Sequence, residues 1–124
     1  MDTLLDRFIR YAKVETTAVE ETKDYPSSPG QLDLGRILAD ELKALKLENV
    51  SMDEFGIVMG TVPGNVPGAA TIAWVSHMDT SPEFTAKDVK PIVHKNYDGK
   101  DIKLPGDPTR VIRVDETEGM ADLK

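Results

Sequence analysis

The sequence is that of a small acidic chain, and its composition excludes several classes of protein. Its 124 residues, 40% hydrophobic and 30% charged, are enough to bury one core and are typical of a folded chain. The net charge of −7 argues against binding to nucleic acid or to an anionic membrane, and the absence of cysteine excludes disulfides, a thiol nucleophile and thiolate zinc ligands.

An amphipathic helix is predicted over residues 3–14. Its apolar residues recur at helical spacing and form one stripe: Leu4, Leu5, Phe8, Ile9 and Ala12. Thr3 and Asp6 stand in the positions of a capping box at its start. Residues 15–27 are polar and have no periodicity, which predicts a loop.

A second helix is predicted to follow an N-cap at Ser28 and to end near Leu47. Ser28 is a good N-cap, Pro29 suits the first helical position, and Gln31 suits the third. We expect this helix to bury its aliphatic side chains: Leu34, Ile37, Leu38, Leu42 and Leu45.

Two short strands joined by a turn are predicted next. Val50 and Met52 show the alternation of a strand, and residues 57–59 follow a turn at Gly56. Residues 62–68 repeat a Val-Pro-Gly unit, which predicts an exposed connection.

A buried strand is predicted over residues 69–75. This run, AATIAWV, is continuously apolar, as in a strand covered on both faces of an α/β sheet. Residues 83–124 hold shorter strand-like pieces at 92–93 and 111–114, and no shift in composition marks a domain boundary. The pattern predicts an α/β fold with a mixed sheet flanked by helices.

Two residues directly after the predicted buried strand are candidates for chemistry, His77 and Asp79. Ligands of open α/β sheets bind beyond the carboxyl ends of the strands, and a metal-bound histidine commonly donates its other ring N–H to a carboxylate. The spacing therefore fits a metal ligand with its orienting partner, although a histidine bonded locally in a loop would look the same. A catalytic triad with Ser76 is excluded, because adjacent strand residues point to opposite faces.

Longer motifs resemble the family of zinc-dependent exopeptidases, over nearly the whole chain. The similar stretches are LLDRFIRYAKVET, YPSSPGQLDLGRILADELKALKLENV, IAWVSHMDTSP and KNYDGKDIKLPGDP. The heptad SHMDTSP and the PSSPGQ helix start point to the branch of the family that acts on tripeptides.

The resemblance implies a role for each residue of the pair. His77 would be a ligand of one of two zinc ions, and Asp79 would be the catalytic aspartate that orients and polarises the metal site. The family hydrolyses peptides by two-metal chemistry, in which a glutamate deprotonates a zinc-bridging water that attacks the carbonyl. We expect release of the N-terminal residue of short peptides, chiefly tripeptides. A related dipeptidase or deacylase, or a non-catalytic α/β binding module, is the alternative.

The family motifs that complete such a site are missing from this sequence. These are Gly-Ala-Asp-Asp-Lys-Ala-Gly, which holds the metal-bridging aspartate, and a Glu-Glu pair, which holds the general base. We therefore expect residues 1–124 to be the incomplete N-terminal portion of the catalytic domain, with no second domain, and to be inactive alone. We also expect a cytoplasmic protein with peptide substrates and no nucleic-acid or membrane partner. A homodimer is left open for the full-length form.

Overall fold

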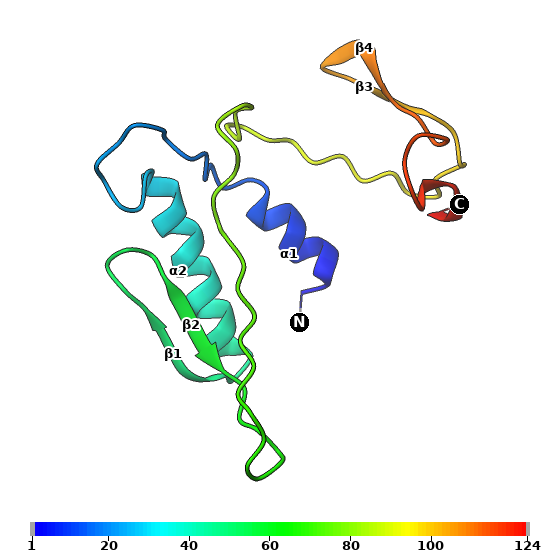
Figure 1. Cartoon of the computed structure of the whole chain (residues 1–124). Helices are drawn as coiled ribbons and strands as arrows, with labels where there is room; N and C mark the ends of the chain where they lie inside the picture. The colour runs from blue at the N-terminus through cyan, green and yellow to red at the C-terminus, as the bar shows by residue number, and fades with distance from the viewer. Residues whose placement is uncertain (1, 124) are drawn as a thin grey trace. The chain divides into compact units, whose positions relative to one another are not determined.

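The computed structural model describes residues 2–123, and the chain divides into two compact units, Met1–Pro91 and Ile92–Lys124. The elements in chain order (Figure 1) are α1 Leu4–Tyr11, α2 Pro29–Ala44, β1 Glu48–Met52, β2 Val58–Thr61, β3 Ile102–Leu104, β4 Asp107–Ile112 and the 3-10 helix η1 Met120–Leu123. Helices combined with two small antiparallel sheets confirm the predicted α/β class. The assignment of all residues to one catalytic domain stays a prediction.

Helix α1 begins as the sequence predicts but is shorter. The backbone N–H of Asp6 donates to the Thr3 hydroxyl at 3.1 Å, and the N–H of Thr3 donates to the Asp6 carboxylate at 2.9 Å. The bonds from Thr3 lower the pKa of Asp6. None of the helical residues is buried, and Leu4 and Phe8 on the apolar stripe are mostly exposed. Helix α1 is therefore not held in place by a buried apolar face.

Helix α2 starts at Pro29, as predicted, and ends at Ala44 rather than at Leu47. Ser28 occupies the N-cap position with an extended backbone, but its side chain makes no capping bond. The helix ends early because Lys46 adopts a left-handed conformation (φ 61°), which reverses the chain into β1.

The face of α2 that packs on the β1–β2 hairpin is narrower than predicted. Leu34 is buried, and so are Gln31, Gly35 and Ala39. The other predicted core residues are half-buried or exposed: Ile37, Leu38, Leu42 and Leu45. A Cβ added to Gly35 would lie 2.9 Å from Cε of Met52 in β1, so the helix and strand approach closely at this point. A two-stranded hairpin covers only one strip of a helix, which explains why the rest of the aliphatic face stays accessible.

The predicted hairpin is confirmed. Strands β1 and β2 pair antiparallel, with Ser51 opposite Met59. Their turn is closed by Asp53, whose carboxylate accepts from the N–H groups of Phe55 at 3.0 Å and Ile57 at 2.8 Å. Gly56 has a φ of +85°, a conformation that favours glycine.

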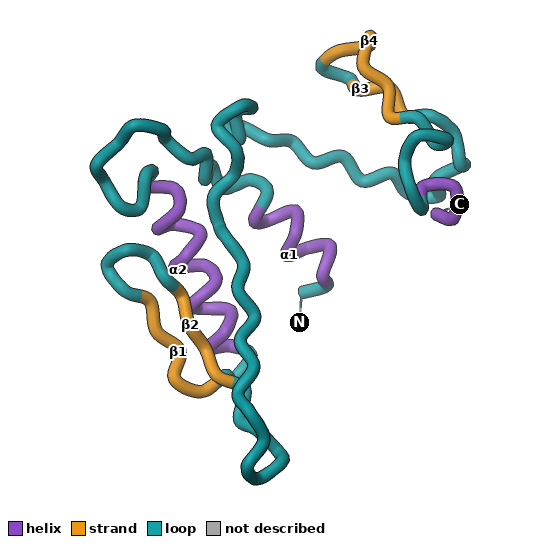
Figure 2. Tube along the Cα trace, in the orientation of Figure 1, coloured by secondary structure: helices purple, strands orange, loops and turns teal. Residues whose placement is uncertain are grey.

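The prediction of a buried strand over residues 69–75 is wrong. The chain that follows β2 runs as a long loop (Figure 2), and Trp74 and Val75 are 90% and 92% exposed. A strand buried on both faces needs paired neighbours and covering helices, and the described residues place neither on this segment. The exposed connection predicted for residues 62–68 is confirmed.

The second unit contains one antiparallel hairpin, β3–β4, and η1, in which Met120 is buried. The strand predicted at 111–114 coincides with β4 only over its first two residues, and residues 92–93 form no strand. Short apolar stretches such as these predict a strand from local residues alone and do not indicate which strand would pair with it. Within residues 2–123, no helix is both long enough and apolar enough to cross a membrane.

Candidate functional site

The structure brings the two predicted site residues into direct contact. The ring nitrogen Nδ1 of His77 lies 2.8 Å from the backbone carbonyl oxygen of Asp79 and 3.1 Å from its carboxylate Oδ1. The His77 side chain is 84% exposed and that of Asp79 is 45% exposed. Both neighbours of Nδ1 are acceptors, so a neutral imidazole carries its proton on Nδ1 and leaves the Nε2 lone pair free. A metal-ligating histidine commonly has this arrangement, and a histidine bonded locally in a loop can have it too.

A short segment from the first loop holds the chain directly after Asp79. The N–H of Thr80 donates to the carbonyl of Thr16 at 3.1 Å, and the N–H of Ala18 donates to the carbonyl of Thr80 at 3.0 Å. These bonds form an isolated parallel bridge between Thr17 and Thr80. Residues 16–18, which we call the 16–18 segment, therefore anchor the chain beside the site to the loop between α1 and α2.

Sequence reasoning missed the 16–18 segment, which it assigned only to a polar loop. Thr16 is 2% exposed, although threonine is mostly found at the surface. No periodicity marks these residues, because their partner is a single extended residue more than sixty positions away. A Thr-Thr-Ala sequence carries no local signal for such pairing.

The described residues offer one candidate metal ligand, His77, and no complete metal centre. Within residues 2–123, no group of three or more histidine, aspartate or glutamate side chains lies close enough to hold an ion. His77 fits zinc as a nitrogen ligand, with Asp79 bonded to its other nitrogen. Catalytic zinc needs three protein ligands, so the fit is partial.

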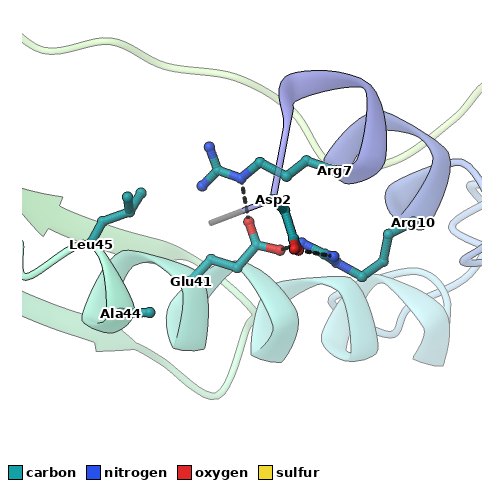
Figure 3. Close-up of a pocket in the computed structure, with 6 residues that line it drawn as sticks. All are labelled: Asp2, Arg7, Arg10, Glu41, Ala44 and Leu45. Carbon is teal, nitrogen blue, oxygen red and sulfur yellow. Dashed lines mark hydrogen bonds and ion pairs between the residues drawn. The ribbon is translucent and has the colours of Figure 1, made fainter.

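A second polar cluster ties α1 to α2, and sequence reasoning missed it as well. Nε of Arg7 donates to the Glu41 carboxylate at 2.9 Å, and the same carboxylate accepts from Arg10 (Figure 3). It also accepts from the Tyr11 hydroxyl. Arg7 and Tyr11 lie four residues apart on α1, which places them on one face, but nothing local indicates Glu41 as their partner.

The cluster has clear electrostatic consequences. Burial acts to raise the pKa of Glu41, but the hydrogen bonds from Tyr11, Arg10 and Arg7 outweigh it and lower that pKa. Burial, followed by the bond to Glu41, raises the pKa of the Tyr11 phenol. Arg7, Arg10 and Glu41 line an open cavity of about 300 Å³. Its arginines are already paired with carboxylates, so its evident role is to attach α1.

Comparison with known proteins finds curated relatives named Peptidase T. The chain is 43% identical over 122 residues to Peptidase T of Listeria monocytogenes. The aligned residues cover 98% of this chain and 30% of the relative. It is 50% identical over 105 residues to Peptidase T of Halothermothrix orenii, covering 84% of this chain and 26% of the relative. The chain is a relative of peptidase T. This finding confirms the resemblance drawn from the motifs.

Two further facts bound that relationship. The chain spans less than a third of the length of the curated peptidase T relatives it matches. No protein-family model matches it. The similarity to peptidase T therefore concerns these residues, and the activity of a whole protein is a matter for proposal.

Proposed function

We propose that this chain is part of a metal-dependent aminopeptidase that releases the N-terminal residue from tripeptides. In this proposal His77 is a ligand of one of two zinc ions, and Asp79 is the catalytic carboxylate beside it. The observation that carries the proposal is the double contact of His77 Nδ1 with Asp79, at 2.8 and 3.1 Å, in a chain related to peptidase T.

The chemistry of the pair follows from its geometry. The carbonyl and the carboxylate of Asp79 both accept hydrogen bonds from the Nδ1–H group of His77. These bonds fix the ring orientation and keep the Nε2 lone pair outward. The negative charge of the carboxylate makes Nε2 a stronger donor toward a cation. Bound zinc would supply a Lewis acid for the peptide carbonyl and would lower the pKa of bound water.

We infer that the remaining ligands and the general base are contributed by residues outside the 124 printed here. Two observations support this. The described residues offer no group of three suitable side chains, and the peptidase T relatives are much longer than this chain. The chain by itself is then an inactive part of the enzyme.

The test compares the two histidines of the sequence in a longer polypeptide that contains this chain. We expect the parent protein to bind two zinc ions and to cleave tripeptides. His77→Ala should lose one zinc and the activity, measured by elemental analysis and by release of the N-terminal amino acid. His94→Ala is the matched control, since His94 is also exposed and lies outside the pair.

The outcomes separate the proposal from its alternatives. A parent protein that binds no zinc, or a His77→Ala variant that retains both zinc and activity, would refute the metal role. Cleavage of dipeptides or acylated amino acids in place of tripeptides would leave the metal role intact and correct the substrate class.

A further inference from the structure

We propose that the 16–18 segment, held in place by Gly30, positions Asp79 against the His77 ring, so that Thr17 and Gly30 are positioning residues of the site. The inference rests on the proposed function, because it gives these residues a purpose only if the pair binds metal.

The extended chain that leads to the pair has no support of its own. Residues 70–79 make no backbone–backbone hydrogen bond with any other described part of the chain. The first backbone bonds occur at Thr80, on both its N–H and its carbonyl, and both go to the 16–18 segment. The location of Asp79, one residue earlier, is therefore set by this attachment.

Thr17 holds the chain beyond the site at a second point. Its hydroxyl accepts a hydrogen bond from the N–H of Ala86 at 3.1 Å, in addition to the backbone bridge between Thr17 and Thr80. The loop from Thr80 to Ala86 is thus fixed at both ends by one short segment. Because two attachment points restrict a loop more than one, Thr17 limits how Asp79 can move.

Gly30 lies against the backbone of Glu15, the residue directly before the 16–18 segment. A Cβ built on Gly30 would lie 1.7 Å from the carbonyl oxygen of Glu15 and 2.8 Å from its carbonyl carbon. No side chain fits at that distance, so any substitution must displace the backbone of Glu15 and, with it, the adjacent Thr16. The start of α2 therefore restricts the position of Glu15 and of the adjoining 16–18 segment.

The experiment determines which ring nitrogen of His77 carries the proton, and it measures the stability of the anchoring hydrogen bonds. Nitrogen NMR of the labelled protein at about pH 9, where imidazole is neutral, reports which ring nitrogen is protonated. Amide hydrogen exchange reports the bonds made by Ala18 and Thr80. In the protein without substitutions we expect the proton on Nδ1 of His77 and protected amides at Ala18 and Thr80.

Gly30→Ala should release the pair. We expect His77 to lose its preference for the Nδ1 proton and the amides of Ala18 and Thr80 to exchange about tenfold faster, the effect of losing one hydrogen bond. Gly64→Ala is the matched control, because a Cβ at Gly64 meets no atom within 4 Å. We expect it to behave as the parent protein does.

A second series keeps the test decisive if Gly30→Ala fails to fold, as judged by lost helical circular dichroism. Thr17→Val preserves shape but cannot accept the bond from Ala86, whereas Thr17→Ser keeps the hydroxyl. We expect Val to weaken the Nδ1 proton preference of His77 and Ser to restore it. A His77 proton that stays on Nδ1 in folded Gly30→Ala, or in Thr17→Val where Gly30→Ala is unfolded, overturns the positioning role.

Zinc alone, added to the same samples, separates this inference from the proposed function. If zinc leaves the Nε2 signal of His77 unchanged in the parent protein and in every variant, the metal role fails, and the proton position still decides the positioning role. If zinc shifts Nε2 equally in all variants while the proton stays on Nδ1, the metal role stands and the positioning role is refuted.

Discussion

Replacing Glu41 by glutamine should detach α1 from α2. The Glu41 carboxylate accepts bonds from Arg7, Arg10 and Tyr11, and α1 buries none of its own residues. Glutamine keeps one acceptor oxygen, loses the negative charge, and places an amide donor near two arginines. The attachment of α1 thus depends on one side chain.

The magnitude follows from the burial of the cluster. Hydrogen bonds to a charged group contribute about 1.5–3 kcal/mol each when they are shielded from water. The Glu41 side chain is 17% exposed, but the arginines are 30% and 37% exposed, so solvent screens these interactions toward the surface range of about 0–1 kcal/mol each. For the three bonds together we expect Glu41→Gln to weaken the attachment of α1 by about 2 kcal/mol.

Hydrogen exchange read by mass spectrometry measures this attachment directly. A loss of about 2 kcal/mol corresponds to about 30-fold faster exchange of the α1 amides, with little change in α2. Asp33→Asn is the control, because its pair with Arg36 lies on the exposed surface and should contribute less than about 0.5 kcal/mol. Unchanged exchange in α1 of Glu41→Gln would show that other contacts hold the helix.

The pH dependence gives a second check on the same cluster. The folded-state pKa of Glu41 is lowered from its ordinary value of 4.5, so its contribution is fully present above that value. The contribution is lost as the pH falls through the lower, folded-state pKa. The difference between the parent protein and Glu41→Gln should therefore stay constant from neutral pH to about pH 5 and shrink below 4.5. A difference that grows as the pH falls below 4.5 would contradict this account.

Three further predictions concern the core, the exposed segment and activity. Leu34→Ala should lower the free energy of unfolding by about 2–3 kcal/mol in urea titrations followed by circular dichroism, while Leu4→Ala on the exposed face of α1 should change it by less than about 0.5 kcal/mol. Trp74 should show water-exposed fluorescence that iodide quenches, and the apolar chain around it should bind hydrophobic dyes; a shielded Trp74 would contradict the exposed loop. The isolated chain should cleave no tripeptide with zinc present, and zinc-dependent cleavage would show that it holds a complete site.

The sequence by itself determined the features that depend on near neighbours. The capping box of Thr3 and Asp6, the start of α2 at Pro29 and the hairpin turn at Gly56 each involve residues within a few positions of one another. The contact between His77 and Asp79 belongs with them, since the two are separated by one residue and meet through a short loop. Short-range geometry brings such groups within reach of one another, and the backbone bonds at Thr80 then set where Asp79 lies.

Only the tertiary structure decided what depends on a distant partner. The apolar run at 69–75 predicted a buried strand, but burial needs neighbours, and the described residues leave Trp74 in solvent. Glu41 meets the arginines of α1 across more than thirty residues, and Thr80 meets Thr16 across more than sixty. A hydrophobic or polar pattern indicates which kind of surface a segment can contact. The partner it contacts is chosen by packing between elements that no local pattern encodes.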